Sequence, residues 1–202
     1  MNSETMILEG IKVLDVASFI AGPVATTVMA DFGAKVIKVE PPVGDGYRKL
    51  TELAGMPEAE EPYHMLVDNR SKRGLCLDLT KEAGRKVLHC LVKDADVLVT
   101  NYMPEVRKKL GLRYGDLAAL NPRLIYGSMS AYGEAGPEAG QTGFDTTAYW
   151  ARSGLMDLVK PDPDGDPARS MPGQGDHPTG LALLSAILLA LLRRERTGKG
   201  SM

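Results

Sequence analysis

Residues 12–40 read KVLDVASFIAGPVATTVMADFGAKVIKVE, and this stretch decides the fold class. Its two ends, residues 12–18 and 34–40, are rich in β-branched and apolar side chains, which is typical of buried strands. Pro23 suits the first turn of a helix between them because its missing N–H needs no partner there, and Gly33 suits the end of that helix. Two strands joined by a crossover helix form a parallel pair with a right-handed connection.

Strand and helix patterns continue to alternate along the chain. Further strands are expected over residues 75–79, 96–100 and 124–128. Helices are expected over residues 81–93, over 104–110 with Gly111 at its end, and over 114–120. The sequence therefore predicts an α/β fold, with a Rossmann-like doubly wound parallel sheet and flanking helices.

The remaining segments are less regular. Residues 44–69 read as irregular, with a weak helical pattern around 63–67, and residues 133–141 and 160–180 read as loops rich in glycine and proline. In a doubly wound sheet, ligands bind beyond the carboxyl ends of the strands. We therefore expect residues 19–23, 101–104 and 129–132, which follow three different strands, to converge on one crevice.

The composition is that of an ordinary globular protein. Of 202 residues, 44% are hydrophobic and 25% are charged, and the net charge of −2 gives no global field that favours nucleic acid. Cys76 and Cys90 belong to no metal or redox motif, so buried free thiols in a reducing cytosol are expected. The first residues lack the pattern of a secretory signal. We therefore expect a cytoplasmic protein.

The longest apolar run extends from Gly180 to Leu192 and continues into a charged turn, Arg193-Arg-Glu-Arg196. This run falls short of the ~20 residues that cross a bilayer. The sequence predicts a buried core helix and no membrane partner.

A Gly/Pro-rich loop precedes that helix and contains Gly175-Asp176-His177. A carboxylate beside a glycine is easy for a substrate to approach, and carboxylates act as covalent nucleophiles toward activated acyl groups. The alternative is that Asp176 only caps the helix that follows.

Several other kinds of site are disfavoured. The turn after the first strand holds no G-x-G-x-x-G, and Gly198-Lys-Gly-Ser201, which is similar to the end of a Walker loop, follows a helix instead of preceding one. A nicotinamide or ATP enzyme is therefore not expected. The three histidines, His64, His89 and His177, are scattered, so no metal is expected. The basic groups 70–73 and 107–109 belong either to a solvated surface or to a site for a phosphorylated ligand such as coenzyme A.

Many short motifs, in order along nearly the whole chain, together resemble the family III CoA-transferases, the CaiB/BaiF group that includes formyl-CoA:oxalate CoA-transferase. The motifs that carry the resemblance are Leu8-Glu-Gly-Ile-Lys-Val-Leu-Asp15, Ala21-Gly-Pro23, Ala30-Asp-Phe-Gly-Ala34, Val36-Ile-Lys-Val-Glu-Pro41, Gly44-Asp45, Asn69-Arg-Ser-Lys-Arg73, Leu77-Asp-Leu79, Asp96-Val-Leu-Val-Thr-Asn101, Leu110-Gly-Leu112, Asn121-Pro-Arg-Leu-Ile-Tyr126, Gly143-Phe-Asp145, Ser153-Gly-Leu-Met156 and Arg196-Thr-Gly-Lys-Gly200.

The resemblance implies that Asp176 is the catalytic carboxylate. In this family it attacks an acyl-CoA thioester, a mixed anhydride forms, and the released CoA thiolate then gives an aspartyl-CoA thioester that an acceptor acid displaces. The expected partners are an acyl-CoA and a carboxylic acid, with coenzyme A bound as part of the substrate. Developing oxyanions need hydrogen-bond donors, and backbone N–H groups of residues 175–180 are candidates.

The resemblance also implies a CoA site. Ile20 and Ala21 would line the thiol end of CoA, and Leu77 and Asp78 would lie by the adenosine. Asn101 and Tyr102 would border the pantetheine arm and the phosphates, and Phe144 would lie over the reacting acyl group. For Ile20, Leu77 and Phe144 the alternative is plain core packing.

Two further functions stay open. The related α-methylacyl-CoA racemases carry histidine in place of Phe144 and use it as an acid and base. Phenylalanine cannot transfer a proton, which favours acyl transfer, but His177 beside Asp176 is a possible substitute base. The other alternative is a CoA-binding fragment without turnover.

Members of the family are longer than this chain. The resemblance implies that residues 1–202 are the N-terminal Rossmann-like large domain, with the small domain and the C-terminal part absent from this sequence. It also implies an interlocked homodimer for a full-length protein.

Overall fold

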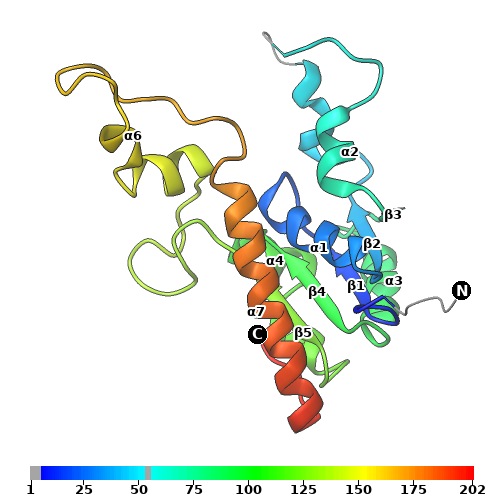
Figure 1. The fold of residues 1–202 in the computed structure, drawn as a ribbon. Coiled ribbons are helices and arrows are strands. Elements are labelled where there is room, and N and C mark those ends of the chain that lie inside the picture. The colour runs from blue at the N-terminus through cyan, green and yellow to red at the C-terminus, as the bar shows by residue number, and fades with distance from the viewer. Residues whose placement is uncertain (1–5, 53–55) are drawn as a thin grey trace, which may run out of the picture.

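The computed structural model describes residues 6–52 and 56–202 and contains a central parallel sheet (Figure 1). The five strands lie in the order β3-β2-β1-β4-β5, and every neighbouring pair is parallel. Their bounds are β1 Lys12–Asp15, β2 Lys35–Glu40, β3 Arg73–Cys76, β4 Val97–Thr100 and β5 Ile125–Ser128. The order reverses direction at β1 and β4, which confirms the predicted doubly wound arrangement.

Helices cover both faces of the sheet. Their bounds are α1 Ala21–Asp31, the 3-10 helix η1 Gly46–Glu52, α2 Tyr63–Asn69, α3 Glu82–Val92, α4 Pro104–Leu110, α5 Tyr114–Ala118, the π-helix η2 Asp145–Ala151, α6 Leu155–Leu158 and α7 Asp176–Thr197. On one face α1 and α7 pack against the sheet through buried residues such as Met29 and Ile187. On the other face, Leu88 of α3 and Leu117 of α5 belong to a second apolar cluster.

Three differences from the predicted elements have physical causes. Strand β1 ends at Asp15, earlier than predicted, because the Ala17 N–H donates to Asp15 Oδ1 at 3.1 Å instead of to a neighbouring strand. Strand β3 begins at Arg73, earlier than predicted, because its pairing with β2 sets its register at this edge of the sheet. The short elements η1, η2 and α6 lie in segments whose sequences show no hydrophobic period.

Helix α7 is longer than the apolar run suggested. It has 22 residues and begins at Asp176, so the catalytic candidate lies on its first turn instead of in a loop. By length and composition it is the one helix of residues 6–52 and 56–202 that is long and apolar enough to cross a membrane. One face, including Leu184, Ile187 and Leu191, is buried on the core. The prediction of a buried core helix is wrong for the opposite face, where Leu189 is 68% exposed, because a helix on a sheet buries only one stripe.

The two cysteines are also placed differently from the prediction. Cys76 and Cys90 are free thiols, as expected, but both are exposed. Cys76 ends the edge strand β3, and Cys90 lies on α3 away from its buried residues Leu88 and Val92. The expected burial was inferred from the usual behaviour of free cysteine and not from these positions.

Gly180 allows α7 to approach α1 closely. A Cβ at Gly180 would lie 2.7 Å from the Ala21 carbonyl oxygen and 2.9 Å from the Val24 side chain. Gly180→Val is therefore expected to lower the free energy of unfolding by about 1–3 kcal/mol, measured by denaturant titration. Gly115→Val on α5 is the matched control, because a Cβ there meets no atom within 4 Å. Equal stability of the two variants would contradict this explanation.

Candidate active site

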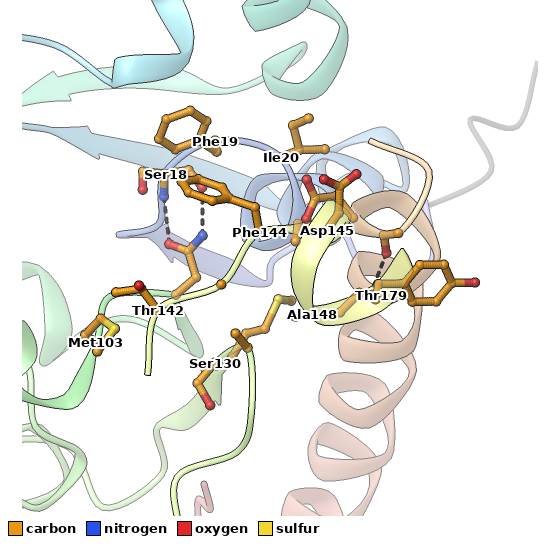
Figure 2. A pocket seen from close by; sticks show the side chains of 18 of the residues that line it. Ser18, Phe19, Ile20, Met103, Ser130, Thr142, Phe144, Asp145, Ala148 and Thr179 are labelled. Carbon is orange, nitrogen blue, oxygen red and sulfur yellow. Dashed lines mark hydrogen bonds between the residues drawn. The ribbon is translucent and has the colours of Figure 1, made fainter. Parts of the chain in front are cut away.

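A cavity of about 430 Å³ opens at the carboxyl edge of the sheet (Figure 2). Its wall includes Phe19 after β1, Asn101 after β4 and Met129 after β5. The predicted convergence of these three segments is therefore confirmed. Two further segments complete the wall, residues 141–149 around the start of η2 and residues 175–179 at the start of α7.

The structure brings most of the predicted site residues to this cavity. Those that line it are Asp176, Ile20, Ala21, Asn101 and Phe144. Tyr102 lines a neighbouring cavity of about 190 Å³, and the two cavities share Ser18 and Phe19 as a wall. Leu77 and Asp78 line neither cavity and follow the edge strand β3.

Asp176 is the first residue of α7 and follows Gly175, the N-cap. Within residues 6–52 and 56–202 its carboxylate has no hydrogen-bond partner, so it does not act as the capping side chain that the alternative interpretation required. Burial raises the pKa of Asp176 to about 6, and the charge of Asp145 adds to this effect while His177 opposes it. The result is a carboxylate that is ionised at neutral pH and more basic than usual.

Asp145 is a second acid at the same cavity. It begins η2, and its Oδ1 accepts a hydrogen bond from the Thr146 N–H at 2.7 Å. Its Oδ2 atom is buried and lacks a hydrogen-bond partner in the described part of the chain. The sequence motif Gly143-Phe-Asp145 contains this residue, but the motif alone does not indicate that Asp145 shares a cavity with Asp176.

Two glycines shape the loop before Asp176. A Cβ at Gly175 would lie 2.7 Å from three atoms of the Tyr149 side chain, so a larger residue does not fit there. Gly173 has φ +78°, a left-handed conformation that favours glycine, and a Cβ there would lie 2.9 Å from the His177 ring. The loop is thus held between Tyr149 and His177.

Backbone donors for an oxyanion are fewer than predicted. The His177 and Thr179 N–H groups donate to the carbonyl oxygens of Gly173 and Gly175, at 3.0 and 3.2 Å. Pro178 has no N–H. Among residues 175–179, the N–H groups of Gly175 and Asp176 remain without a partner from the described chain.

Two aromatic rings that line the cavity contact each other. The rings of Phe19 and Phe144 meet edge to face with 6.0 Å between centroids, and both are labelled in Figure 2. Phe19 has φ +59°, which is unusual for a bulky residue. The Asn101 amide fixes this turn by accepting from the Ser18 N–H at 2.9 Å and donating to the Ser18 carbonyl at 2.8 Å (dashed lines, Figure 2). Asn101 therefore supports the wall in addition to lining it.

The basic side chains of residues 70–73 and 107–109 differ in whether they are available to bind a ligand. Lys72 is buried in an ion pair with Asp15, and Arg107 is buried in an ion pair with Glu134. Neither is free to bind a phosphate, which corrects the sequence-based expectation for these two residues. Arg73, Lys108 and Lys109 are exposed. In the described part of the chain, no three His, Cys, Asp or Glu side chains come together in a way that could hold a metal.

The comparisons with known proteins settle the family. The sequence profile of CoA-transferase family III matches residues 8–202. This chain belongs to CoA-transferase family III. Its sequence is 38% identical over 196 residues to (R)-2-hydroxy-4-methylpentanoate CoA-transferase of Clostridioides difficile, covering 96% of the chain and 49% of that relative. It is 40% identical over 196 residues to succinyl-CoA:glutarate CoA-transferase of Mus musculus, covering 96% of the chain and 43% of that relative.

Solved structures of the family agree with the fold. A CAIB/BAIF family protein from Brucella suis superposes with a TM-score of 0.89 at 36% identity, over 98% of this chain and 52% of that one. Rv3272 from Mycobacterium tuberculosis gives a TM-score of 0.86 at 37% identity, over 98% of this chain and 54% of that one. The chain spans about half the length of the family III relatives it matches.

Proposed function

We propose that this chain supplies the acyl-accepting carboxylate and much of the CoA site of an enzyme that transfers CoA from an acyl-CoA to a carboxylic acid. The observation that carries the proposal is the Asp176 carboxylate, which lines the cavity without a hydrogen-bond partner from the described residues. Membership of CoA-transferase family III supports it, as do the names of relatives that transfer CoA.

The proposed reaction needs no separate base. An Asp176 oxygen attacks the thioester carbonyl, the C–S bond breaks, and CoA leaves as a thiolate, so that a mixed anhydride remains. The thiolate then attacks the Asp176 carbonyl of the anhydride, which releases the first acid as a carboxylate and forms an aspartyl-CoA thioester. The acceptor carboxylate attacks that thioester and expels the thiolate. The thiolate finally attacks the acyl carbonyl of the new anhydride, which forms the new acyl-CoA and restores Asp176.

The site residues fit this sequence of steps. A pKa of about 6 makes Asp176 a stronger nucleophile than an ordinary carboxylate, yet leaves it ionised at pH 7. The unpaired N–H groups of Gly175 and Asp176 are suitable donors to a developing oxyanion. Ile20 and Ala21 present apolar surface to the thiol end of CoA, and Phe144 presents it to the acyl group.

The rest of the CoA site is a proposal from the family resemblance. We place the pantetheine arm along Asn101 and toward the neighbouring cavity at Tyr102, since Ser18 and Phe19 join the two cavities. Leu77 and Asp78 are proposed for the adenosine, farther along the sheet edge beyond β3. The cytoplasmic location, the interlocked homodimer and the division into a large and a small domain remain predictions.

Racemisation is not supported by the geometry of His177. Its Nδ1 lies 2.8 Å from the Gly173 carbonyl oxygen and its Nε2 lies 3.1 Å from Asp68 Oδ1. Both ring nitrogens are thus occupied, and Phe144 has no titratable group. His177, which the sequence suggested as a substitute base, is therefore not available to remove an α-proton.

The decisive experiment is to trap the covalent intermediate. The protein is incubated with an acyl-CoA, treated with hydroxylamine or borohydride, and the modified residue is located by mass spectrometry. Modification at Asp176 is expected. A chain that binds the acyl-CoA but is never modified would support the alternative of a CoA-binding fragment without turnover.

The pH dependence of acylation provides a further prediction. Since only the carboxylate attacks, the rate of adduct formation at Asp176 is expected to rise with pH through about 6. Asp145→Asn removes a charge that raises the pKa of Asp176, so the midpoint of this rise is expected to move to lower pH. The exposed Asp166 is the control site, and Asp166→Asn is expected to leave the midpoint unchanged. An unchanged midpoint in Asp145→Asn would contradict the coupling of the two acids.

A further inference from the structure

The His177 ring joins two segments that are far apart in the sequence. His177 Nδ1 lies 2.8 Å from the carbonyl oxygen of Gly173, in the loop before Asp176. Its Nε2 lies 3.1 Å from Asp68 Oδ1, on α2. The ring therefore connects the loop of the nucleophile to a different helix, 109 residues earlier in the chain.

The two partners define the protonation state of the ring. A carbonyl oxygen only accepts hydrogen bonds, and so does an ionised carboxylate. A neutral imidazole has one donor nitrogen and one acceptor nitrogen, so it satisfies only one of these partners. Both contacts are hydrogen bonds only when His177 is an imidazolium.

The surrounding charges favour that form. Burial lowers the pKa of His177, but the Gly173 carbonyl and the Asp68 and Asp176 carboxylates outweigh it, so the pKa lies above its usual value. The Asp68 side chain is only 4% exposed, which limits screening by water. Other groups act through Asp68, because the Tyr47 hydroxyl of η1 donates to its Oδ2 at 2.8 Å and Lys72 donates to its carbonyl oxygen at 3.2 Å.

Asp68 is held in position by contacts with other elements of the fold. Its backbone carbonyl also accepts from the Thr27 hydroxyl of α1, and Lys72 is in turn paired with the fully buried Asp15 of β1. His177 therefore contacts a residue that is itself hydrogen-bonded to core elements of the fold. The loop on the other side of the ring, residues 171–175, contains no regular secondary structure.

We propose that His177 is a positioning residue whose imidazolium ties the loop 171–175 to Asp68 and thereby fixes the Asp176 carboxylate in the cavity. This inference rests on the proposed function of Asp176 and adds an upper pH limit to the acylation of Asp176. A group with a raised pKa keeps its contact at lower pH and loses it as the pH rises through that pKa. The contact between His177 and Asp68 is therefore lost as the pH rises through the raised pKa of His177, whereas the nucleophile is lost by protonation below about pH 6.

The first test measures the tether without turnover. In the protein labelled with ¹⁵N, the ring nitrogens of His177 are expected to have imidazolium chemical shifts at pH 7. Asp68→Asn is expected to lower the titration midpoint of His177, because a neutral amide replaces the facing charge. Asp31→Asn, which alters the exposed pair with Arg70, is the matched control and should not move the midpoint. A neutral His177 at pH 7 in the unmodified protein would overturn the proposal.

The second test measures the loop and the chemistry. The His177 and Thr179 amides donate to the Gly173 and Gly175 carbonyl oxygens. Their protection from hydrogen exchange, relative to the intrinsic rate at each pH, is expected to fall above the His177 midpoint, and at lower pH in Asp68→Asn. With acyl-CoA, acylation of Asp176 in His177→Gln and Asp68→Asn is expected to be about tenfold slower than in the unmodified protein at pH 7, where His177 is charged, with the KM for acyl-CoA nearly unchanged, and the difference is expected to disappear above the His177 midpoint. Tyr47→Phe keeps the Asp68 charge and should retain the alkaline limit.

The outcomes separate this inference from the proposed function. If the unmodified protein shows the imidazolium and the pH-dependent exchange but no adduct at Asp176, the proposed function fails while the tether stands. If Asp176 is acylated at the same rate in all variants and at all pH values above 7, the function stands and the positioning role of His177 is excluded.

Discussion

Replacing Asp176 with asparagine is expected to abolish formation of the covalent acyl and CoA adducts and to reduce CoA transfer at least about 1,000-fold. Asparagine has nearly the shape of aspartate but lacks the anionic oxygen that attacks the thioester. CoA binding is expected to remain, because the residues proposed for the pantetheine arm and adenosine lie on other segments. Intact-protein mass spectrometry and a CoA-binding titration measure the two effects separately.

Asp176→Asn is also expected to change the stability of the protein, and the stability measurement shows whether the variant is folded. Burial raises the pKa of Asp176 to about 6, so the native state holds this proton more tightly than the unfolded state does. Above that pH the ionised group lowers stability, and removing it is expected to stabilise the fold at pH 8 by on the order of 1 kcal/mol, since partial exposure screens the charge. Asp166→Asn in an exposed loop serves as the control for both measurements. Normal turnover by a well-folded Asp176→Asn protein would exclude the nucleophile mechanism.

Lys72→Met is expected to cause the largest loss of stability, about 3–5 kcal/mol at pH 7. Lys72 Nζ lies 2.7 Å from Asp15 Oδ2, and the two side chains are only 2% and 0% exposed. The same ammonium also donates to the Pro23 carbonyl at 2.9 Å and to Asn69 Oδ1 at 2.9 Å. Methionine fills a similar volume but leaves the Asp15 charge buried without this partner. A loss of this size corresponds to roughly 10 °C in Tm for a chain of 202 residues.

An exposed ion pair of the same chain supplies the matched control. Lys12 and Asp94 pair at the surface, with side chains 47% and 75% exposed. Lys12→Met is expected to cost less than about 1 kcal/mol, because water already solvates both charges. Thermal unfolding of the two variants at one pH compares them directly. Equal losses would contradict the argument that burial makes the Lys72 pair important.

The elements that the sequence predicted most accurately have clear local boundaries. Helix α4 was predicted at Pro104–Leu110 and lies there, because proline favours the first turn and Gly111 ends it with φ +73°. The helix η2 and the segment after it were not predicted, since distant contacts hold them. The Trp150 indole N–H donates to the Ala168 carbonyl at 2.7 Å, for example. The hydrophobic pattern of the local sequence does not indicate such a contact.

The candidate site likewise contains some residues that the sequence indicated and others that it did not. The family resemblance indicated Asp176, and the placement of Asn101 follows from its position after a predicted strand. Asp68 was not predicted as a site residue, because nothing near residue 68 indicates that it faces His177 across 109 residues. The first turn of α7 was also missed, since Gly175 and Pro178 read as loop residues, although proline in a first turn lacks only an N–H that the turn does not need.

The cavity is composed of segments that follow β1, β4 and β5, of residues 141–149 and of the start of α7, so it depends on the pairing of these three strands. A ligand that binds the native state alone stabilises every segment that must be folded for binding. Saturation with CoA should therefore slow the global unfolding reaction as a unit, and amides in β1 and β5, far from each other in sequence, should gain equal protection.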